Sequence, residues 1–240
     1  MQTKMPIHKI VLLLIFSAGF ASMAHAGPII PAPGTQLIYD TFGPNNGYQC
    51  CGGWVVSGFF PGIQSGEVLA AAFTPNVNVT FADAWLPLTF EGSGAGSAIN
   101  VFLESDSGGL PSTILATLAL NYGQLTGTSS ILGFGCGDKD DCPTLTQGTQ
   151  YWVVAQQTAA STSDLWNETT STAGGGPFAY NLLDSATGPW SLTSSTTIFS
   201  GSPPAFAVDG VVTPEPGTLV LFGSGLISIV ALTRRKLFTQ

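Results

Sequence analysis

At 240 residues the chain is long enough for one large domain or two small ones, and it carries only six basic and fourteen acidic residues. Both histidines and five of the basic residues lie near the two ends, so the segment 27–210 keeps one lysine, no histidine and no arginine. That composition excludes Ser-His-Asp and Cys-His hydrolysis, histidine-ligated zinc and arginine clamps on phosphate in this segment. Thirteen acids against one lysine give the segment a formal charge of −12, which argues against nucleic acid as a partner.

The first 26 residues are typical of a secretory signal peptide. A basic start precedes an apolar run that is shorter than a membrane span needs. Ala24 and Ala26 then form a small-x-small cleavage pattern. We expect cleavage between Ala26 and Gly27, which leaves an exported domain at 27–210 and a linker and tail at 211–240.

The sequence of the exported domain favours β-strands. Short runs of β-branched and aromatic residues alternate with Gly, Pro, Ser, Thr and Asn, without a sustained helical period. The predicted strands, in chain order, are 37–40, 54–56, 67–73, 77–80, 85–90, 97–104, 114–120, 150–156, 165–167, 179–183 and 205–208. Two of them, 67–73 and 114–120, fit a helical turn equally well. Closely spaced turns predict an all-β domain built as a β-sandwich or jelly roll.

Two of these segments allow a more detailed prediction. In 97–104 the side chains alternate between faces, with Phe102 and Glu104 on the same side, which is typical of a half-buried strand. In 85–90 the ring of Pro87 removes a ladder N–H, so we expect an edge strand there.

All four cysteines lie in the exported domain and suggest disulfides in an oxidising compartment. Four cysteines allow three pairings. If Cys136 pairs with Cys142, then Cys50 and Cys51 remain as a vicinal pair or as free thiols, so we favour crossed pairing between the two groups. A metal site of four thiolates is disfavoured, because Cys50 and Cys51 lack the usual C-x2-C spacing.

The loop between Cys136 and Cys142 contains Asp138, Asp140 and Asp141, whose carboxylates are of the type that binds calcium. The loop lacks the ligand spacing and closing Glu of an EF-hand, so we expect a solvated acidic loop, with a calcium site as the alternative.

Paired carboxylates can hydrolyse a glycosidic bond without histidine. Glu67, Glu91, Glu104 and Asp106 are available, but their spacing identifies no acid and nucleophile. A turn at SDSGG indicates instead that Glu104 and Asp106 are exposed turn carboxylates.

The five tryptophans are candidates for stacking against sugars: Trp54, Trp85, Trp152, Trp166 and Trp190. Trp152 lies in the run YWVVA and is predicted to be in the core. Trp166 and Trp190 have polar, loop-like neighbours and are the better candidates for exposure, although a buried tryptophan with one hydrogen bond is the expectation for any single one.

The tail has three parts. A charge-free apolar segment at 217–233 follows the turn Pro214-Glu215-Pro216 and precedes the basic cluster Arg234-Arg235-Lys236. These 17 residues form about 25 Å of helix, slightly short of a hydrocarbon core of about 30 Å, and snorkelling basic side chains make up the difference. We predict one transmembrane helix in the inner membrane, with the basic C-terminus in the cytoplasm and the domain outside.

These three parts, in this order behind a signal peptide, resemble the PEP-CTERM sorting signal of Gram-negative bacteria. The resemblance implies recognition of Pro214, Glu215 and Pro216 by an exosortase, a membrane-embedded cysteine protease or transpeptidase. It further implies transfer of the protein to the cell surface or the exopolysaccharide matrix. Four residues after Lys236 extend slightly past the usual ending.

The exported domain resembles the choice-of-anchor R type of exported domain. The matching stretches are 39–43, CCGGWVVSG, 73–75, VFLESDSGGLPSTIL, 148–152, 166–167 and 205–210. The resemblance implies no catalytic residues. We therefore expect a non-enzymatic, exported protein without a cofactor. The first alternative is a carbohydrate- or calcium-binding module, and the second is a glycoside hydrolase.

Overall fold

The computed structural model describes residues 23–25, 29, 31–62, 64–90, 99–124, 128–137, 142–171, 176–193 and 202–213. Over these residues the chain is all-β, with fourteen strands in one sheet, a single short 3-10 turn, η1 (Pro44–Asn46), and no α-helix.

The strands follow the chain in order. They are β1 (Met23–His25), β2 (Gln36–Asp40), β3 (Gly47–Phe60), β4 (Ser65–Phe73), β5 (Val79–Phe90), β6 (Ile99–Ser107), β7 (Leu110–Tyr122), β8 (Ser130–Cys136), β9 (Thr144–Leu145), β10 (Tyr151–Gln157), β11 (Ser163–Thr169), β12 (Phe178–Asn181), β13 (Ser191–Thr193) and β14 (Ala207–Val212).

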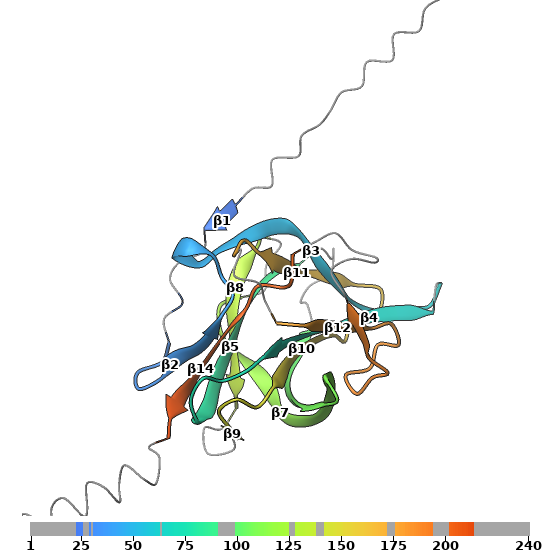
Figure 1. Ribbon diagram of the computed structural model, residues 1–240. Helices are drawn as coiled ribbons and strands as arrows, with labels where there is room; N and C mark the ends of the chain where they lie inside the picture. Colours follow the sequence, from blue (N-terminus) through green and yellow to red (C-terminus); the bar gives the residue numbers. More distant parts are fainter. Residues whose placement is uncertain are drawn as a thin grey trace, which may run out of the picture.

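Eight of the strands form a closed antiparallel barrel. The order around the barrel is β3, β11, β5, β8, β7, β6, β10 and β4, and β4 pairs back with β3 at Ser57↔Glu67 and Phe60↔Ser65. Figure 1 shows these strands around a common interior. The all-β prediction is confirmed, but the β-sandwich or jelly roll is wrong. A β-sandwich and a closed barrel have the same alternation of inward- and outward-facing side chains within each strand. They differ in whether the two outermost strands pair with each other.

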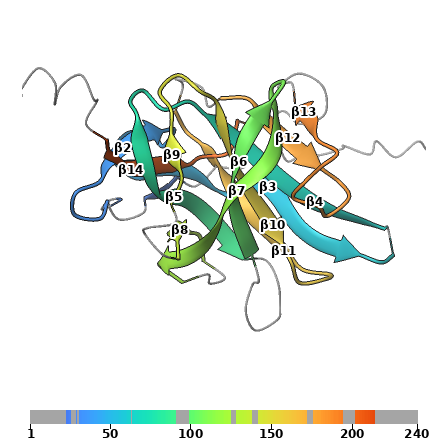
Figure 2. The ribbon, with the colours of Figure 1, turned by 90° about the horizontal axis from the view of Figure 1, so that it is seen from below.

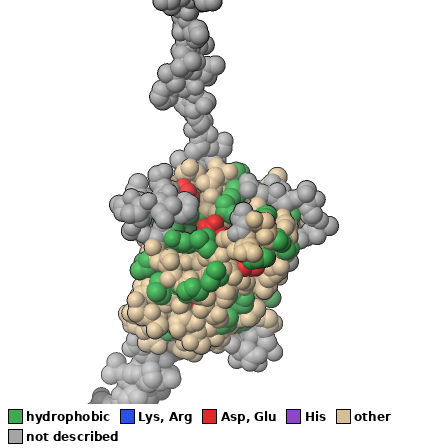
Figure 3. Space-filling model, turned by 90° about the vertical axis from the view of Figure 1, so that its right-hand side faces the viewer, with side chains coloured by type: hydrophobic (Ala, Val, Ile, Leu, Met, Phe, Trp, Pro, Cys, Tyr) green, Lys and Arg blue, Asp and Glu red, His purple; other side chains and the backbone are tan. Residues whose placement is uncertain are grey.

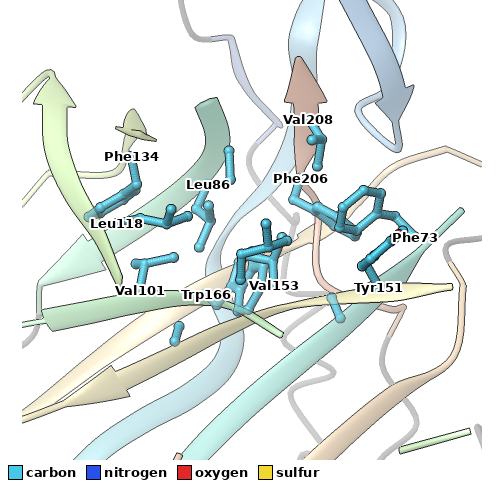
Figure 4. Packing of buried hydrophobic residues seen from close by; sticks show 14 of the residues in the cluster. Phe73, Leu86, Val101, Leu118, Phe134, Tyr151, Val153, Trp166, Phe206 and Val208 are labelled. Atoms are coloured by element: carbon cyan, nitrogen blue, oxygen red, sulfur yellow. The ribbon is translucent and has the colours of Figure 1, made fainter. Parts of the chain in front are cut away.

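The interior of the barrel is a packed apolar core. Alternate side chains of each strand point inward, and Figure 4 shows side chains from β4, β5, β6, β7, β8, β10, β11 and β14 meeting there. The rings of Trp166 and Phe206 pack edge to face with centroids 6.1 Å apart. An eight-stranded barrel is just wide enough for side chains to fill it, so burial of this core is the main source of stability.

Strand β10 is buried on both of its faces. Val153 points into the barrel, whereas Trp152 and Val154 belong to a second apolar cluster on the outside of β4, β6 and β10. Ala186 and Trp190, from the segment after β12, pack onto this second cluster. Double burial explains why YWVVA is continuously apolar instead of alternating.

Strand β5 changes its partner along its length. Its first half pairs with β14 and its second half with β11, beginning at Trp166↔Leu88. Pro87 lies at this change, and its carbonyl accepts a hydrogen bond from Nδ2 of Asn167 at 3.0 Å. The N–H and C=O of a strand residue point to the same side. The N–H that Pro87 lacks would therefore face the point where β5 changes from β14 to β11, so its absence costs no ladder hydrogen bond. The prediction of an edge strand at 85–90 is therefore wrong.

The two ends of the described fold lie at opposite ends of the barrel (Figure 1). β1 pairs with β3, with Ala24 opposite Tyr48, and β14 ends at Val212. Ala26 and Gly27, the residues of the predicted cleavage site, lie outside the described residues, as does the apolar segment 217–233. In the part of the chain that the structure describes, we find no helix of the length and hydropathy that a membrane span requires.

Candidate functional site at the C-terminal strand

Strand β14 carries the chain to the predicted sorting turn. It lies between β2 and β5, as Figure 2 shows. Thr213, directly after β14, donates its N–H and its hydroxyl to the carbonyl of Asn78, both at 3.1 Å. Pro214-Glu215-Pro216 and Arg234-Arg235-Lys236 lie outside the described residues. The described fold thus extends to the residue before the predicted turn.

Asp209 anchors β14 to the barrel wall. Its buried carboxylate accepts hydrogen bonds from the N–H of Asp83 at 2.8 Å, Nε1 of Trp85 at 3.4 Å and the hydroxyl of Thr35 at 3.3 Å. Burial, together with the Asp83 carboxylate, raises the pKa of Asp209 to about 6 despite these hydrogen bonds. The sequence analysis did not identify Asp209 as a site residue. The one signal in the sequence was an acidic residue directly after the predicted apolar strand 205–208.

Asp83 forms a polar pair with Asn121 on the outside of the barrel. Nδ2 of Asn121 donates to Oδ1 of Asp83 at 3.1 Å. Both groups lie over Gly135 of β8, where a Cβ atom would collide with the Asp83 carboxylate and the Asn121 amide. The lack of a side chain at Gly135 is therefore what allows the pair to form.

An aromatic pair lies beside this polar pair. The rings of Trp85 and Tyr122 stack with centroids 5.1 Å apart and an interplanar angle of 21°. They lie over Gly133 of β8, where a Cβ would come within 2.8 Å of the Tyr122 ring and 2.9 Å of the Trp85 ring. The run Gly-Phe-Gly in β8 thus supports a polar pair and an aromatic pair on one outer face.

A pocket of about 120 Å³ opens at this face, next to β14. Its lining is Ala32, Pro33, Thr35, Thr80, Phe81, Ala82, Asp83, Asn121, Tyr122, Cys136, Cys142 and Val211. The pocket therefore brings together acidic, amide, hydroxyl and aromatic groups from separate strands.

The structure pairs Cys50 with Cys51 and Cys136 with Cys142, whose Cα atoms are 5.7 Å apart. The favoured crossed pairing is wrong. Cys50 lies on β3 and Cys136 on β8, and β11 and β5 lie between these strands. Three strand spacings of about 4.8 Å exceed the Cα separation of about 7 Å that a disulfide can span.

The predicted acidic loop is outside the described residues, since Asp138, Asp140 and Asp141 all fall there. Among the residues that are described, no three His, Cys, Asp or Glu side chains are grouped as a metal site requires. The calcium alternative therefore has no support from this part of the chain.

The candidate carboxylates have unequal surroundings. Glu104 is fully buried on β6, and neither of its oxygens has a hydrogen-bond partner in the described part of the chain. Burial raises the pKa of Glu104 to about 8 and that of Glu67 to about 7. Asp106 accepts from Nε1 of Trp152 at 2.8 Å. Glu91 lies outside the described residues.

The expectation that Glu104 is an exposed turn residue is wrong, because β6 continues to Ser107 and the chain turns at Gly108 and Gly109. Both glycines have positive φ, which suits them to this turn. Asp106 is half-buried, and its hydrogen bonds give it a structural role.

The tryptophans do not form a common sugar-binding face. Trp54, Trp85, Trp152 and Trp166 are buried, which confirms the core prediction for Trp152 and shows that Trp166 is not an exposed candidate. Trp166 lies inside the barrel, and its Nε1 donates to the carbonyl of Ala205 at 2.7 Å. Trp190 packs partly buried on the outer cluster, so the two proposed residues lie on opposite sides of the wall.

Comparison with known proteins supports one functional assignment. No curated protein matches the chain. Residues 212–236 match the family model of the PEP-CTERM protein-sorting motif, which begins at the last residue of β14 and ends with the basic cluster. The motif points to an exported, cell-surface-directed protein that is a target of an exosortase.

Proposed function

We propose that this protein is a non-enzymatic envelope protein that an exosortase transfers to the cell surface or the exopolysaccharide matrix. The observation that carries the proposal is the position of the sorting motif, which starts where the barrel ends. In this proposal the apolar segment 217–233 spans the inner membrane once and holds the barrel at the outer face until processing. The choice-of-anchor resemblance of the barrel remains a prediction.

The barrel suits a role as passive cargo. Its interior is filled by apolar side chains, and β14 is fixed by backbone ladders on both edges as well as by Asp209. A protein that is held by its C-terminus and then released needs a last strand that stays in place when the tail is removed. The bonds from Thr213 to Asn78 secure the end of that strand.

The charge of the described residues argues against direct attachment of the barrel to an anionic membrane. None of the described residues is Lys or Arg, and on the face in Figure 3 acidic side chains lie among apolar patches and uncharged surface. Such a surface repels anionic lipid headgroups and nucleic acid, so attachment to the membrane depends on the tail.

Fractionation of cells tests the proposal. The variant Pro214-Glu215-Pro216→Ala is compared with the wild-type protein in cells with and without the exosortase. We expect wild-type protein at the surface or in the medium only when the exosortase is present, and variant protein in the inner membrane in both strains. The matched control is a triple alanine substitution of exposed residues of the barrel, Thr113 and Thr117 on β7 and Gln124 just after it.

Equal release of variant and wild-type protein would contradict the proposal. Release of both proteins from cells without an exosortase would contradict it as well, because it would show that another route removes the tail.

A further inference from the structure

The pocket beside β14 has features that sorting does not require. Asp83, which is 4% exposed, lies between the anchored strand β14 and the exposed residues Asn121 and Tyr122 of β7. Thr80 adds a hydroxyl group to the lining, and Val211 adds an apolar surface. A buried acceptor, an amide and an exposed aromatic ring therefore converge on one small cavity.

These groups are held in a fixed arrangement. Asn121 donates to Asp83, and Tyr122 stacks on Trp85, so the amide and the ring have little freedom to move. The bare backbone of β8 at Gly133 and Gly135 leaves the space that both pairs occupy. Pre-organisation of this kind lowers the entropy cost of binding.

The chemistry of the lining selects among ligand classes. An anionic ligand would approach carboxylates in a region where the described residues include neither Lys nor Arg. A divalent cation requires several oxygen ligands, and the described residues offer no group of three acidic, Cys or His side chains. A neutral ligand with adjacent hydroxyl groups matches a carboxylate, an amide and a threonine hydroxyl.

The size of the pocket further restricts the class of ligand. A cavity of about 120 Å³ that opens at the surface has room for several water molecules. This space accepts one edge of a single sugar ring, with the rest of the sugar outside against Tyr122. The apolar C–H face of a pyranose suits an aromatic ring, and its hydroxyl groups suit the polar edge.

We propose that the pocket formed by Asp83, Asn121 and Tyr122 binds the hydroxyl edge of an uncharged pyranose sugar. The site differs from the tryptophan-based surface that the sequence suggested, because Trp166 is inside the barrel. Binding there does not depend on processing by an exosortase, so the site and the sorting proposal can fail separately.

Saturation-transfer NMR on the full-length chain in detergent tests the site. The probes are glucose, galactose, mannose and N-acetylglucosamine, with glucuronate and Ca²⁺ as charged comparisons. We expect saturation transfer to at least one neutral sugar and none to glucuronate. Asn121→Ala is expected to weaken that sugar's binding at least tenfold, and Tyr122→Ser is a second variant at the rim.

The matched control is Asn100→Ala, which removes an exposed asparagine of β6 that does not line the pocket. It should bind as the wild type does, and all variants are checked for cooperative thermal unfolding. Absence of transfer to all four neutral sugars would overturn the proposal. Equal sugar binding by wild-type protein, Asn121→Ala and Tyr122→Ser would overturn it too. So would displacement of the bound sugar by Ca²⁺, which would show that the pocket is a cation site.

Discussion

Thr213 donates both its backbone N–H and its side-chain hydroxyl to the carbonyl oxygen of Asn78, each at 3.1 Å. This contact joins the residue before the sorting turn to the residue before β5. It marks the boundary between the folded barrel and the tail, because β14 is paired up to Val212↔Val79. Removal of the tail beyond this point should leave the barrel intact.

Truncation tests that boundary. A chain that ends at Thr213 should unfold at the same temperature as the full-length chain. A chain that ends at Phe206 lacks β14, which pairs with both β2 and β5 and buries Val208 and Asp209. We expect this shorter chain to lose cooperative unfolding, as measured by circular dichroism during heating. Cooperative unfolding of both chains at one temperature would show that β14 is dispensable.

Asp209→Ala should strongly destabilise the barrel. The substitution removes the acceptor for the N–H of Asp83 and for Nε1 of Trp85. A buried donor left without an acceptor costs about 1–3 kcal/mol, so we expect a loss of about 3 kcal/mol in the free energy of unfolding by urea. Asp40→Ala, at an exposed acid that accepts one hydrogen bond, from the N–H of Phe42, is the matched control and should cost about 1 kcal/mol. Equal effects of the two substitutions would contradict the anchoring role of Asp209.

The stability of the barrel should fall as the pH rises through neutrality. The pKa of Glu104 is about 8 in the fold against an ordinary value of 4.5. Between these values the folded chain holds a proton that the unfolded chain has released, so stability is lost as pH rises. Asp209, with a pKa of about 6, and Glu67, with a pKa of about 7, act in the same direction. We expect a higher unfolding temperature at about pH 5 than at about pH 9.

Glu104→Gln separates this residue from the other acids. The amide stays neutral, so the variant should match the wild type at about pH 5 and be more stable at about pH 9. The measurement is the unfolding temperature at both pH values. The control is Glu168→Gln, at a second buried carboxyl, which accepts a hydrogen bond from the N–H of Ser202. A pH profile unchanged by Glu104→Gln would show that Glu104 ionises normally in the fold.

The disulfide pairing has a direct chemical test. Digestion without reduction should give one peptide that contains the Cys136–Cys142 bond and another that contains the Cys50–Cys51 bond, with no cross-link between them. Closure of a loop with a sequence separation of 6 stabilises a fold by about 2 kcal/mol. Cys136→Ser with Cys142→Ser should therefore lower the free energy of unfolding by about this amount. A cross-linked peptide pair would contradict the structure.

The sequence predicted the strands whose side-chain pattern is local. Alternation at 97–104 and the apolar run at 150–156 correspond to β6 and β10. Strand β8 was missed because its run SILGFGC contains two glycines, which resemble a turn signal. Those glycines are required by the neighbouring side chains of β5 and β7, which no local pattern reveals.

The features that depend on distant contacts could not be predicted. Barrel closure rests on pairings between strands far apart in the chain, such as β11 with β3 and β10 with β4. Glu104 is buried between β7 and β10, where it lies opposite Ile114 and Trp152. The candidate pocket likewise combines Thr35, Asp83, Asn121 and Val211, which are far apart in the chain. The sorting motif was predicted because it is a contiguous segment whose order of turn, apolar run and basic residues is visible in the sequence.

The intact mass of the exported protein tests the central claim most directly. Protein is collected from the surface and medium of cells with the exosortase, and from membranes of cells without it. We predict that the exported form begins at Gly27 and lacks the basic cluster Arg234-Arg235-Lys236, while the form retained without the exosortase still contains it. An exported form whose mass includes the complete C-terminal tail would contradict the account.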